Sequence, residues 1–267
     1  MKKLLSRSFR PSIEALEHRV TPSATLGYNY SVSVKAGVLE IHGGYAGDKV
    51  SVSQIPGTNK LRVVFGSNTH TFTNASKIKS IIFNGYGGND VFQNNTAISC
   101  TARGGVGDDV LYGGFGVNTM YGDEGNDQLF GAGKVNFLFG GADDDYLLGD
   151  AGVDYIYGEQ GDDTAIGGAG DDFLFGGTGK DALYGQLSND TLDGGDDGSA
   201  DYLNGGAGRD KFQVEGYGRP GSQLALLYFN LDDPADFNSK DDSFFGEDQP
   251  AATLDVGQPP PPPVATF

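Results

Sequence analysis

The chain has 267 residues, of which 44 are glycine and one is cysteine, and its formal net charge is −18. Residues 104–213 hold 22 acidic and 4 basic residues, whereas residues 1–103 carry a net charge of +7. A surface this acidic repels phosphate groups, which excludes nucleic acid as a partner and favours divalent cations. The single cysteine, Cys100, excludes an internal disulfide framework.

Residues 1–23 are predicted to form a leader with a short helical stretch over 13–19, which Pro22 ends. Lys2 and Lys3 give the chain a basic start, but no apolar run follows them. A cleaved secretory signal is therefore not predicted. No run in the sequence reaches the roughly 18 apolar residues that cross a bilayer, so no transmembrane segment is expected.

Residues 24–103 are predicted to form short β-strands and degenerate repeats. Gly, Pro and Asn separate four β-branched or alternating stretches, at 38–41, 49–53, 60–65 and 69–72. Two faint copies of the later repeat also occur here. One places Asp48 at its sixth position, and the other, over 85–93, places Asp90 there. This region is therefore expected to form the first coils or the cap of a solenoid, because a stack needs a covered end.

Residues 104–213 repeat one nine-residue unit twelve times, with two extra residues in the unit that starts at 194. The clearest copy is Gly-Gly-Ala-Gly-Asp-Asp-Phe-Leu-Phe at 167–175. Position 8 is apolar in every unit, and position 6 is Asp in ten units and Asn in two, Asn118 and Asn136. A period this strict predicts a stacked solenoid and not a globule with a mixed core.

The period is lost after residue 213. Residues 214–248 are interpreted as a C-terminal cap, because the apolar run 224–229 could close the stack before an acidic, turn-rich exit. Residues 249–267 contain five consecutive prolines and are predicted to be a disordered tail that acts as a spacer. A proline-rich ligand for an aromatic groove is the alternative interpretation of this tail.

Each unit divides into a turn at positions 1–6 and a short strand at positions 7–9. Glycines at positions 1, 2 and 4 permit positive φ and a close backbone approach, so that carbonyl oxygens converge. The carboxylate at position 6 adds a charged oxygen. Calcium takes six to eight oxygen ligands at about 2.3–2.6 Å, from carboxylates and carbonyls together. The turn composition therefore predicts calcium binding.

Two units make one coil of 18 residues, so the position-6 side chains should form two ladders. One ladder runs through Asp109, Asp127, Asp145, Asp163, Asp181 and Asp201, and the other through Asn118, Asn136, Asp154, Asp172, Asp190 and Asp210. Stacked coils lie about 4.8 Å apart. Two carboxylates at that spacing repel by roughly 3–4 kcal/mol at an effective dielectric constant near 20. The block is therefore expected to be largely unfolded without calcium and to fold on binding it.

The sites should differ in strength. The strongest are expected between Asp145 and Asp163, between Asp163 and Asp181, and between Asp154 and Asp172. Weaker calcium binding is expected where the unit departs from its pattern, including the two-residue insertion that separates Asp181 from Asp201 and Asp190 from Asp210. The other departures are neutral side chains at position 6 and non-glycine residues at position 4, namely Asn118, Asn136, Lys134, Asp143 and Ser188.

The units resemble the Gly-Gly-x-Gly-x-Asp-x-apolar-x repeats of RTX, or hemolysin-type calcium-binding, proteins. The resemblance covers about 110 of the 267 residues. It implies an all-β fold, a right-handed parallel β-roll, with several Ca²⁺ ions between the turns. It also implies secretion to the extracellular space or the cell surface, by a type I system with an uncleaved C-terminal signal. The metal ligands that it implies are Asp90, Asp109, Asp127, Asp145, Asp154, Asp163, Asp172, Asp181, Asp190, Asp201 and Asp210.

The predicted function is an exported calcium-binding solenoid with a structural, adhesive or surface-matrix role. The alternative is a carbohydrate-binding module, or a folding and secretion module related to RTX enzymes or toxins. An enzyme is not predicted, because neither a His-Glu-x-x-His nor a Gly-x-Ser-x-Gly motif is present. Many residues at the outward positions 7 and 9 are aromatic. They would either bind an extracellular polysaccharide or a cell surface, or stack between coils and stiffen the sheet.

Overall fold

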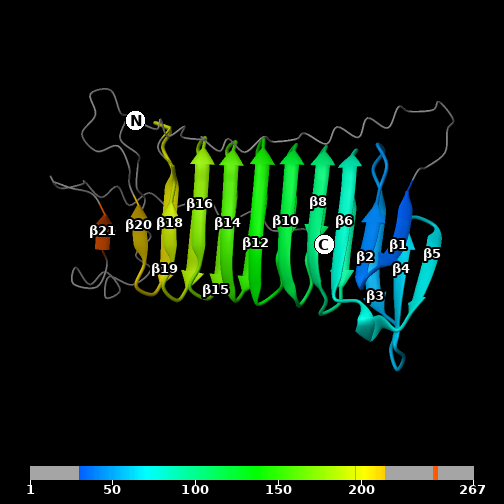
Figure 1. Ribbon diagram of the computed structural model, residues 1–267. Coiled ribbons are helices and arrows are strands. Elements are labelled where there is room, and N and C mark those ends of the chain that lie inside the picture. The colour runs from blue at the N-terminus through cyan, green and yellow to red at the C-terminus, as the bar shows by residue number, and fades with distance from the viewer. Residues whose placement is uncertain (1–29, 196, 214–242, 246–267) are drawn as a thin grey trace, which may run out of the picture.

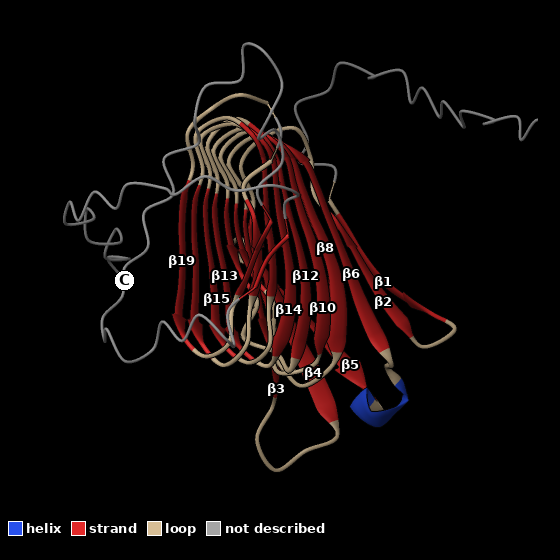
Figure 2. Cartoon of the chain, turned by 90° about the vertical axis from the view of Figure 1, so that its left-hand side faces the viewer, coloured by secondary structure: helices blue, strands red, loops and turns tan. Residues whose placement is uncertain are grey.

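A computed structural model describes residues 30–195, 197–213 and 243–245. These residues form strands and one short 3-10 helix, η1 (Ala75–Lys77). Two sheets face each other, and stacked turns join them at both edges, as the view along the long axis shows (Figure 2). The leader predicted over 1–23, the tail over 249–267 and the cap over 214–248, apart from 243–245, lie outside the described residues.

The larger sheet has eleven strands, which lie side by side along the molecule (Figure 1). In spatial order they are β1 (Ser31–Lys35), β2 (Val38–His42), β6 (Ser80–Gly87), β8 (Ser99–Val106), β10 (Val117–Glu124), β12 (Val135–Ala142), β14 (Val153–Gln160), β16 (Phe173–Thr178), β18 (Thr191–Asp193), β20 (Lys211–Gln213) and β21 (Ser243–Phe245). β1 and β2 pair in antiparallel fashion, and every later pair from β2 to β21 is parallel.

The second sheet has ten strands. In spatial order they are β19 (Tyr202–Ala207), β17 (Ala182–Leu187), β15 (Thr164–Ala169), β13 (Tyr146–Ala151), β11 (Gln128–Phe130), β9 (Val110–Tyr112), β7 (Val91–Asn95), β3 (Lys49–Gln54), β4 (Lys60–Phe65) and β5 (Asn68–Thr73). From β6 to β20 the chain alternates between the two sheets, one strand at a time. The predicted all-β parallel solenoid is therefore confirmed.

Strand register in the repeat block has the predicted 18-residue spacing. Met120 pairs with Leu138, and Leu138 pairs with Ile156. Where the unit at 194 adds two residues, the spacing becomes 20, as in the pairing of Leu192 with Phe212. The strands on both sides keep their register, so the turn accommodates the insertion.

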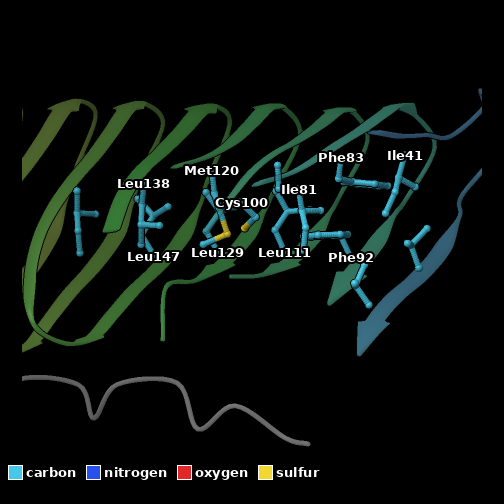
Figure 3. Packing of buried hydrophobic residues seen from close by; sticks show 14 of the residues in the cluster. Ile41, Ile81, Phe83, Phe92, Cys100, Leu111, Met120, Leu129, Leu138 and Leu147 are labelled. Carbon is cyan, nitrogen blue, oxygen red and sulfur yellow. The ribbon is translucent and has the colours of Figure 1, made fainter. Parts of the chain in front are cut away.

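The position-8 side chains fill a thin core between the two sheets. Met120 and Leu138 from the larger sheet meet Leu129 and Leu147 from the second sheet (Figure 3). All four are fully buried. Burying one such side chain contributes roughly 1.5–3 kcal/mol, so the row of position-8 residues is the main apolar contribution to the stability of the coils.

The N-terminal strands continue both sheets and enclose a wider apolar core. Phe83 and Phe92 stack in it with ring centroids 4.6 Å apart. Farther out, the ring of Tyr30 stacks on Phe65 at 4.1 Å. The antiparallel pairs β1–β2, β3–β4 and β4–β5 form this end of the molecule. The first parallel coil is therefore covered by hairpins on both sheets.

Candidate metal sites in the turns

The predicted metal ligands occupy equivalent places at the end of each turn. Because side chains alternate along a strand, position 6 shares the inward direction of position 8. The side chains are at most 5% exposed. They are Asp90, Asp109, Asp127, Asp145, Asp154, Asp163, Asp172, Asp181, Asp190, Asp201 and Asp210.

Hydrogen bonds join these residues into two ladders with the predicted members. In the first ladder, the backbone N–H of Asp145 donates to Oδ1 of Asp163 at 2.8 Å. In the second ladder, the N–H of Asp154 donates to Oδ1 of Asp172 at 2.8 Å. The insertion does not interrupt the first ladder, because Asp181 still donates to Oδ1 of Asp201 at 3.0 Å. Each ladder residue, or rung, therefore uses one side-chain oxygen to accept a hydrogen bond from the neighbouring coil.

The second carboxylate oxygen behaves differently. Nine buried Oδ2 atoms have no hydrogen-bond partner within the described part of the chain. They belong to Asp90, Asp109, Asp127, Asp145, Asp154, Asp163, Asp172, Asp181 and Asp190. A buried carboxylate without a compensating partner is strongly unfavourable, and such charges are normally paired or coordinate a metal. These turns therefore each lack a positive partner for one oxygen.

The glycine at position 1 makes room for this oxygen. A Cβ on Gly122 would overlap Oδ2 of Asp127 and would lie 2.5 Å from the carbonyl oxygen of Gly140 in the next coil. Gly158 is placed in the same way, with Asp163 and the carbonyl oxygen of Gly176 beside it. A carboxylate oxygen and a carbonyl oxygen thus converge on one space. This donor set fits calcium, a hard cation that binds oxygen ligands.

The two units with Asn at position 6 show which atoms surround the space beside the position-6 side chain. Nδ2 of Asn118 donates to the carbonyl oxygens of Gly114 at 2.8 Å and Gly131 at 2.9 Å, and to Oδ1 of Asn136 at 2.8 Å. The carbonyl oxygen of Gly116 lies at 3.4 Å. The amide orientation follows from these partners, because only its nitrogen can donate. Oxygen atoms therefore surround the position of Nδ2 in Asn118. An Asp oxygen at the same position would need a cation or a proton between it and these atoms.

Burial raises the pKa of the position-6 carboxyl groups, while the N–H bond from the preceding coil lowers it and nearby carboxylates raise it further. The pKa reaches about 8 for Asp145 and Asp190. It is raised to about 7 for Asp90, Asp127, Asp172 and Asp181. It is raised to about 6 for Asp109, Asp154 and Asp163. Without a cation, many of these groups would hold a proton near neutral pH.

Backbone oxygens would have to complete each coordination shell. Over residues 30–213 without 196, and over 243–245, no group of three or more His, Cys, Asp or Glu side chains is placed to hold one ion. Backbone carbonyl oxygens are ligands that calcium accepts beside carboxylates.

A family model for the RTX calcium-binding nonapeptide repeat matches the chain in 4 copies, over residues 101–129, 130–165, 166–198 and 196–212. Residues 101–212 are RTX calcium-binding repeats. No curated protein sequence matches the chain. All the predicted ligands lie inside this RTX block except Asp90, which precedes it.

A further, exposed ladder is formed at position 5, and it was not predicted from the sequence. The N–H of Asp162 donates to Oδ1 of Asp144 at 2.8 Å, and the N–H of Lys180 donates to Oδ1 of Asp162 at 2.8 Å. These bonds run from a coil to the coil before it, whereas the position-6 bonds run to the coil after it. The recurrence of Asp or Asn at position 5 in alternate units was the available signal.

Asp48 also extends the first RTX ladder beyond the predicted ligands. Its backbone N–H donates to Oδ1 of Asp90 at 2.6 Å. Its own Oδ2 accepts the N–H of Gly44 at 2.8 Å. Asp48 therefore adds a rung to the ladder, and its second oxygen already has a protein partner.

Two of the predicted weak turns carry backbone strain. Asp143 and Ser188, at position 4, have φ values of 77° and 85°. Position 2 shows the same feature at Asp123 and Glu159, with φ values of 82° and 80°. Side chains in this left-handed region are uncommon, so these turns keep the glycine-like path at a cost in stability.

The outward aromatic rings of the RTX block stack between coils. Tyr121, Phe139, Tyr157 and Phe175 form one continuous stack, with centroids 4.9 to 5.0 Å apart and planes within 10° of each other. The guanidinium group of Arg103 lies 4.3 Å from the ring centroid of Tyr121 at the end of this stack. Ring faces inside the stack are covered by neighbouring rings, which favours the stiffening interpretation.

Proposed function

We propose that this chain is a calcium-binding solenoid whose RTX block folds when ions bind in its turns. The buried, unpartnered Oδ2 atoms carry this proposal, because they recur in step with the coils and face carbonyl oxygens. The proposed ligands are the position-6 carboxylates Asp90, Asp109, Asp127, Asp145, Asp154, Asp163, Asp172, Asp181, Asp190, Asp201 and Asp210.

In the folded coil, the chain's own residues position the Asp163 carboxylate. The hydrogen bond from Asp145 to Asp163 fixes the orientation of the Asp163 carboxylate, and Gly158 keeps the space beside its Oδ2 open. A bound calcium ion would supply positive charge there and offset the repulsion between successive rungs. The same charge would keep the carboxylates from acting as proton donors, so a structural role follows and not catalysis.

We propose further that the protein is exported and has a structural, adhesive or surface-matrix role. RTX repeats are typical of exported proteins, and extracellular calcium-binding modules bind with Kd values of about 10⁻⁴–10⁻³ M. No helix over residues 30–195, 197–213 and 243–245 has the length and apolar character for a bilayer crossing. Stacked rings and two sheets joined by ladders would make a stiff rod that suits such a role.

The carbohydrate-binding alternative receives less support from the aromatic residues. Sugar rings bind to open aromatic faces, but the faces of Phe139 and Tyr157 are covered by their neighbours in the stack. A glycan array in the presence of calcium would test it directly.

Far-UV circular dichroism tests the proposed function. The purified chain is compared in EDTA, in millimolar magnesium and in millimolar calcium, and bound calcium is measured by equilibrium dialysis. We expect the β signal to increase strongly with calcium and weakly with magnesium, because magnesium requires a stricter octahedral geometry. A chain that retains no calcium in dialysis and shows the same spectrum in EDTA would contradict the proposal.

A further inference from the structure

The RTX block has two edges of stacked turns, and the first carries the first ladder while the second carries the second ladder. These edges differ at the N-terminal end of the block. On the first edge, the buried Oδ2 atoms without a partner among the described residues begin at Asp90 and Asp109. On the second edge they begin only at Asp154. The rungs before Asp154 on this edge are Asn118 and Asn136, both fully buried. The first turns of the block therefore differ between the two edges, because carboxylates occupy position 6 on the first edge and amides occupy it on the second.

The side-chain amide group of Asn118 forms hydrogen bonds with the oxygens of its turn. Its two amide hydrogens are shared among oxygens of its own turn and of the next coil, the nearest at 2.8 Å. The coil before it contributes no carboxylate, because the strand partner of Asn118 there is Cys100. The thiol of Cys100 donates to Oδ1 of Asn118 at 3.3 Å. Every polar atom of the Asn118 side chain thus has a protein partner.

Asn136 repeats this arrangement one coil later. Its Nδ2 donates to the carbonyl oxygen of Gly149 at 3.1 Å and to Oδ1 of Asp154 at 2.7 Å. Its backbone N–H donates to the same Asp154 oxygen at 2.8 Å. Oδ1 of Asp154 is therefore satisfied by Asn136, while Oδ2 of Asp154 has no partner in the described part of the chain.

We propose that the amide groups of Asn118 and Asn136 replace calcium ions. The second edge of the block then carries no ion before Asp154, whereas the first edge carries ions from Asp90 onward. This inference rests on the proposed calcium binding and specifies which turns take part in it. It implies that, in the calcium-bound protein, the coils over 99–142 are closed on one edge by amide hydrogen bonds and not by ions.

Conversion of these residues into carboxylates tests the proposal. Asn136→Asp keeps the side-chain shape but replaces the amide NH₂ group, a hydrogen-bond donor, with a carboxylate oxygen that faces the other oxygens of the turn. Asn118→Asp does the same one coil earlier. We expect each variant to bind one calcium ion more per chain than the wild type, measured by equilibrium dialysis at saturating calcium. An unchanged ion number in both folded variants would overturn the proposal.

The reverse substitution provides a second test that does not depend on the stability of those variants. Asp163→Asn should bind one ion fewer than the wild type, and it should fold at a lower calcium concentration than Asp163→Ala because an amide now satisfies the turn. Asp163→Ala is the matched control, since it also removes the carboxylate but supplies no donor. If the calcium concentration at the folding midpoint of Asp163→Asn is no lower than that of Asp163→Ala, amide replacement is wrong.

Failure of the proposed calcium binding and failure of the proposed role of the asparagines give different results. Absence of calcium binding by the wild-type chain would refute the proposed function itself. Normal binding by the wild type, without the gain in Asn136→Asp and Asn118→Asp and without the lower calcium midpoint of Asp163→Asn, would refute only the role of the asparagines.

Discussion

Oδ1 of Asp181 accepts the backbone N–H of Asp163 at 2.9 Å, while Oδ2 of Asp181 is buried with no partner in the described residues. One carboxylate thus links two coils through its first oxygen and offers its second oxygen to a cation. Because both tasks fall to the same side chain, the pairing of coils and the binding of ions are coupled. Loss of the ion should therefore loosen the contact between coils.

Calcium removal should affect the two halves of the described chain differently. In EDTA we expect the coils over 104–213 to lose protection from hydrogen exchange, because their turns contain the unpartnered carboxylates. The strands over 38–73 should stay protected, since none of the proposed ligands lies in them and the antiparallel pairs β3–β4 and β4–β5 hold them. Peptide-resolved hydrogen exchange measures both regions at once. Equal loss of protection along the chain would contradict this expectation.

The stability of the metal-free chain should fall as pH rises. Burial raises the folded-state pKa of Asp145 to about 8 and of Asp127 to about 7, from 3.8. Between about pH 4 and pH 8 the folded state therefore holds protons that the unfolded state has released. In EDTA, the urea midpoint should be highest near pH 4 to 5 and should decrease toward pH 8. A midpoint that rises over this range would show that burial does not control these groups.

Calcium should reverse this dependence, because the ion and the proton compete for the same oxygens. The calcium concentration at the folding midpoint should decrease as pH rises from 6 to 8. A circular dichroism titration at several pH values measures this, and a pH-independent midpoint would argue against ligation by Asp145 and its equivalents.

A methyl group at position 1 of a turn should be poorly tolerated. In Gly122→Ala the new Cβ would overlap Oδ2 of Asp127 and approach the Gly140 carbonyl oxygen. We expect a loss of about 2 kcal/mol or more in unfolding free energy at saturating calcium, as for other overpacked sites. Gly44→Ala is the control, because no atom outside its immediate neighbours lies within 4 Å of its Cβ position. Similar losses in both variants would contradict the steric explanation.

Removal of one ring from the aromatic stack should lower stability without changing ion binding. Phe139 lies between Tyr121 and Tyr157, so Phe139→Ala removes two stacked pairs. Each pair is worth about 0.5–1.5 kcal/mol, so we expect a loss of about 1–3 kcal/mol in unfolding free energy. Phe115→Ala, at a ring that is 71% exposed, should change it by less than about 0.5 kcal/mol. A changed calcium number in Phe139→Ala would show that the stack also shapes the turns.

The nine-residue period was sufficient to predict the 18-residue coil, the inward direction of position 8 and the membership of both ladders. These features are repeated and local, so sequence spacing determines them. The different roles of the two carboxylate oxygens were not predictable. Which oxygen accepts the hydrogen bond between coils, and which one is available to bind a cation, depends on how each side chain contacts the next coil. The strands over 38–73 were predicted one by one, but Ser31–Lys35 was not. Their place in the two sheets was not predictable, since it depends on the pairings β2–β6 and β3–β7, which join residues distant in the sequence.

The asparagines illustrate the same limit. Asn118 and Asn136 were expected to bind calcium weakly because they lack a charge, but what fills their turns was not predicted. In the structure their amide groups have partners on every side, so neutrality is compensated by hydrogen bonds. Sequence alone shows which side chain departs from the pattern, but the surrounding oxygens decide what the departure does.

The hairpins at the N-terminal end also affect how molecules meet each other. A parallel coil with an open edge presents unpaired N–H and C=O groups that would accept a coil from another molecule, and such addition could continue into a fibre. Here the outermost strands, β1 and β5, belong to antiparallel pairs. A parallel coil arriving from a second molecule would meet antiparallel hairpins at this end and could not continue the alternation between the two sheets that the coils follow.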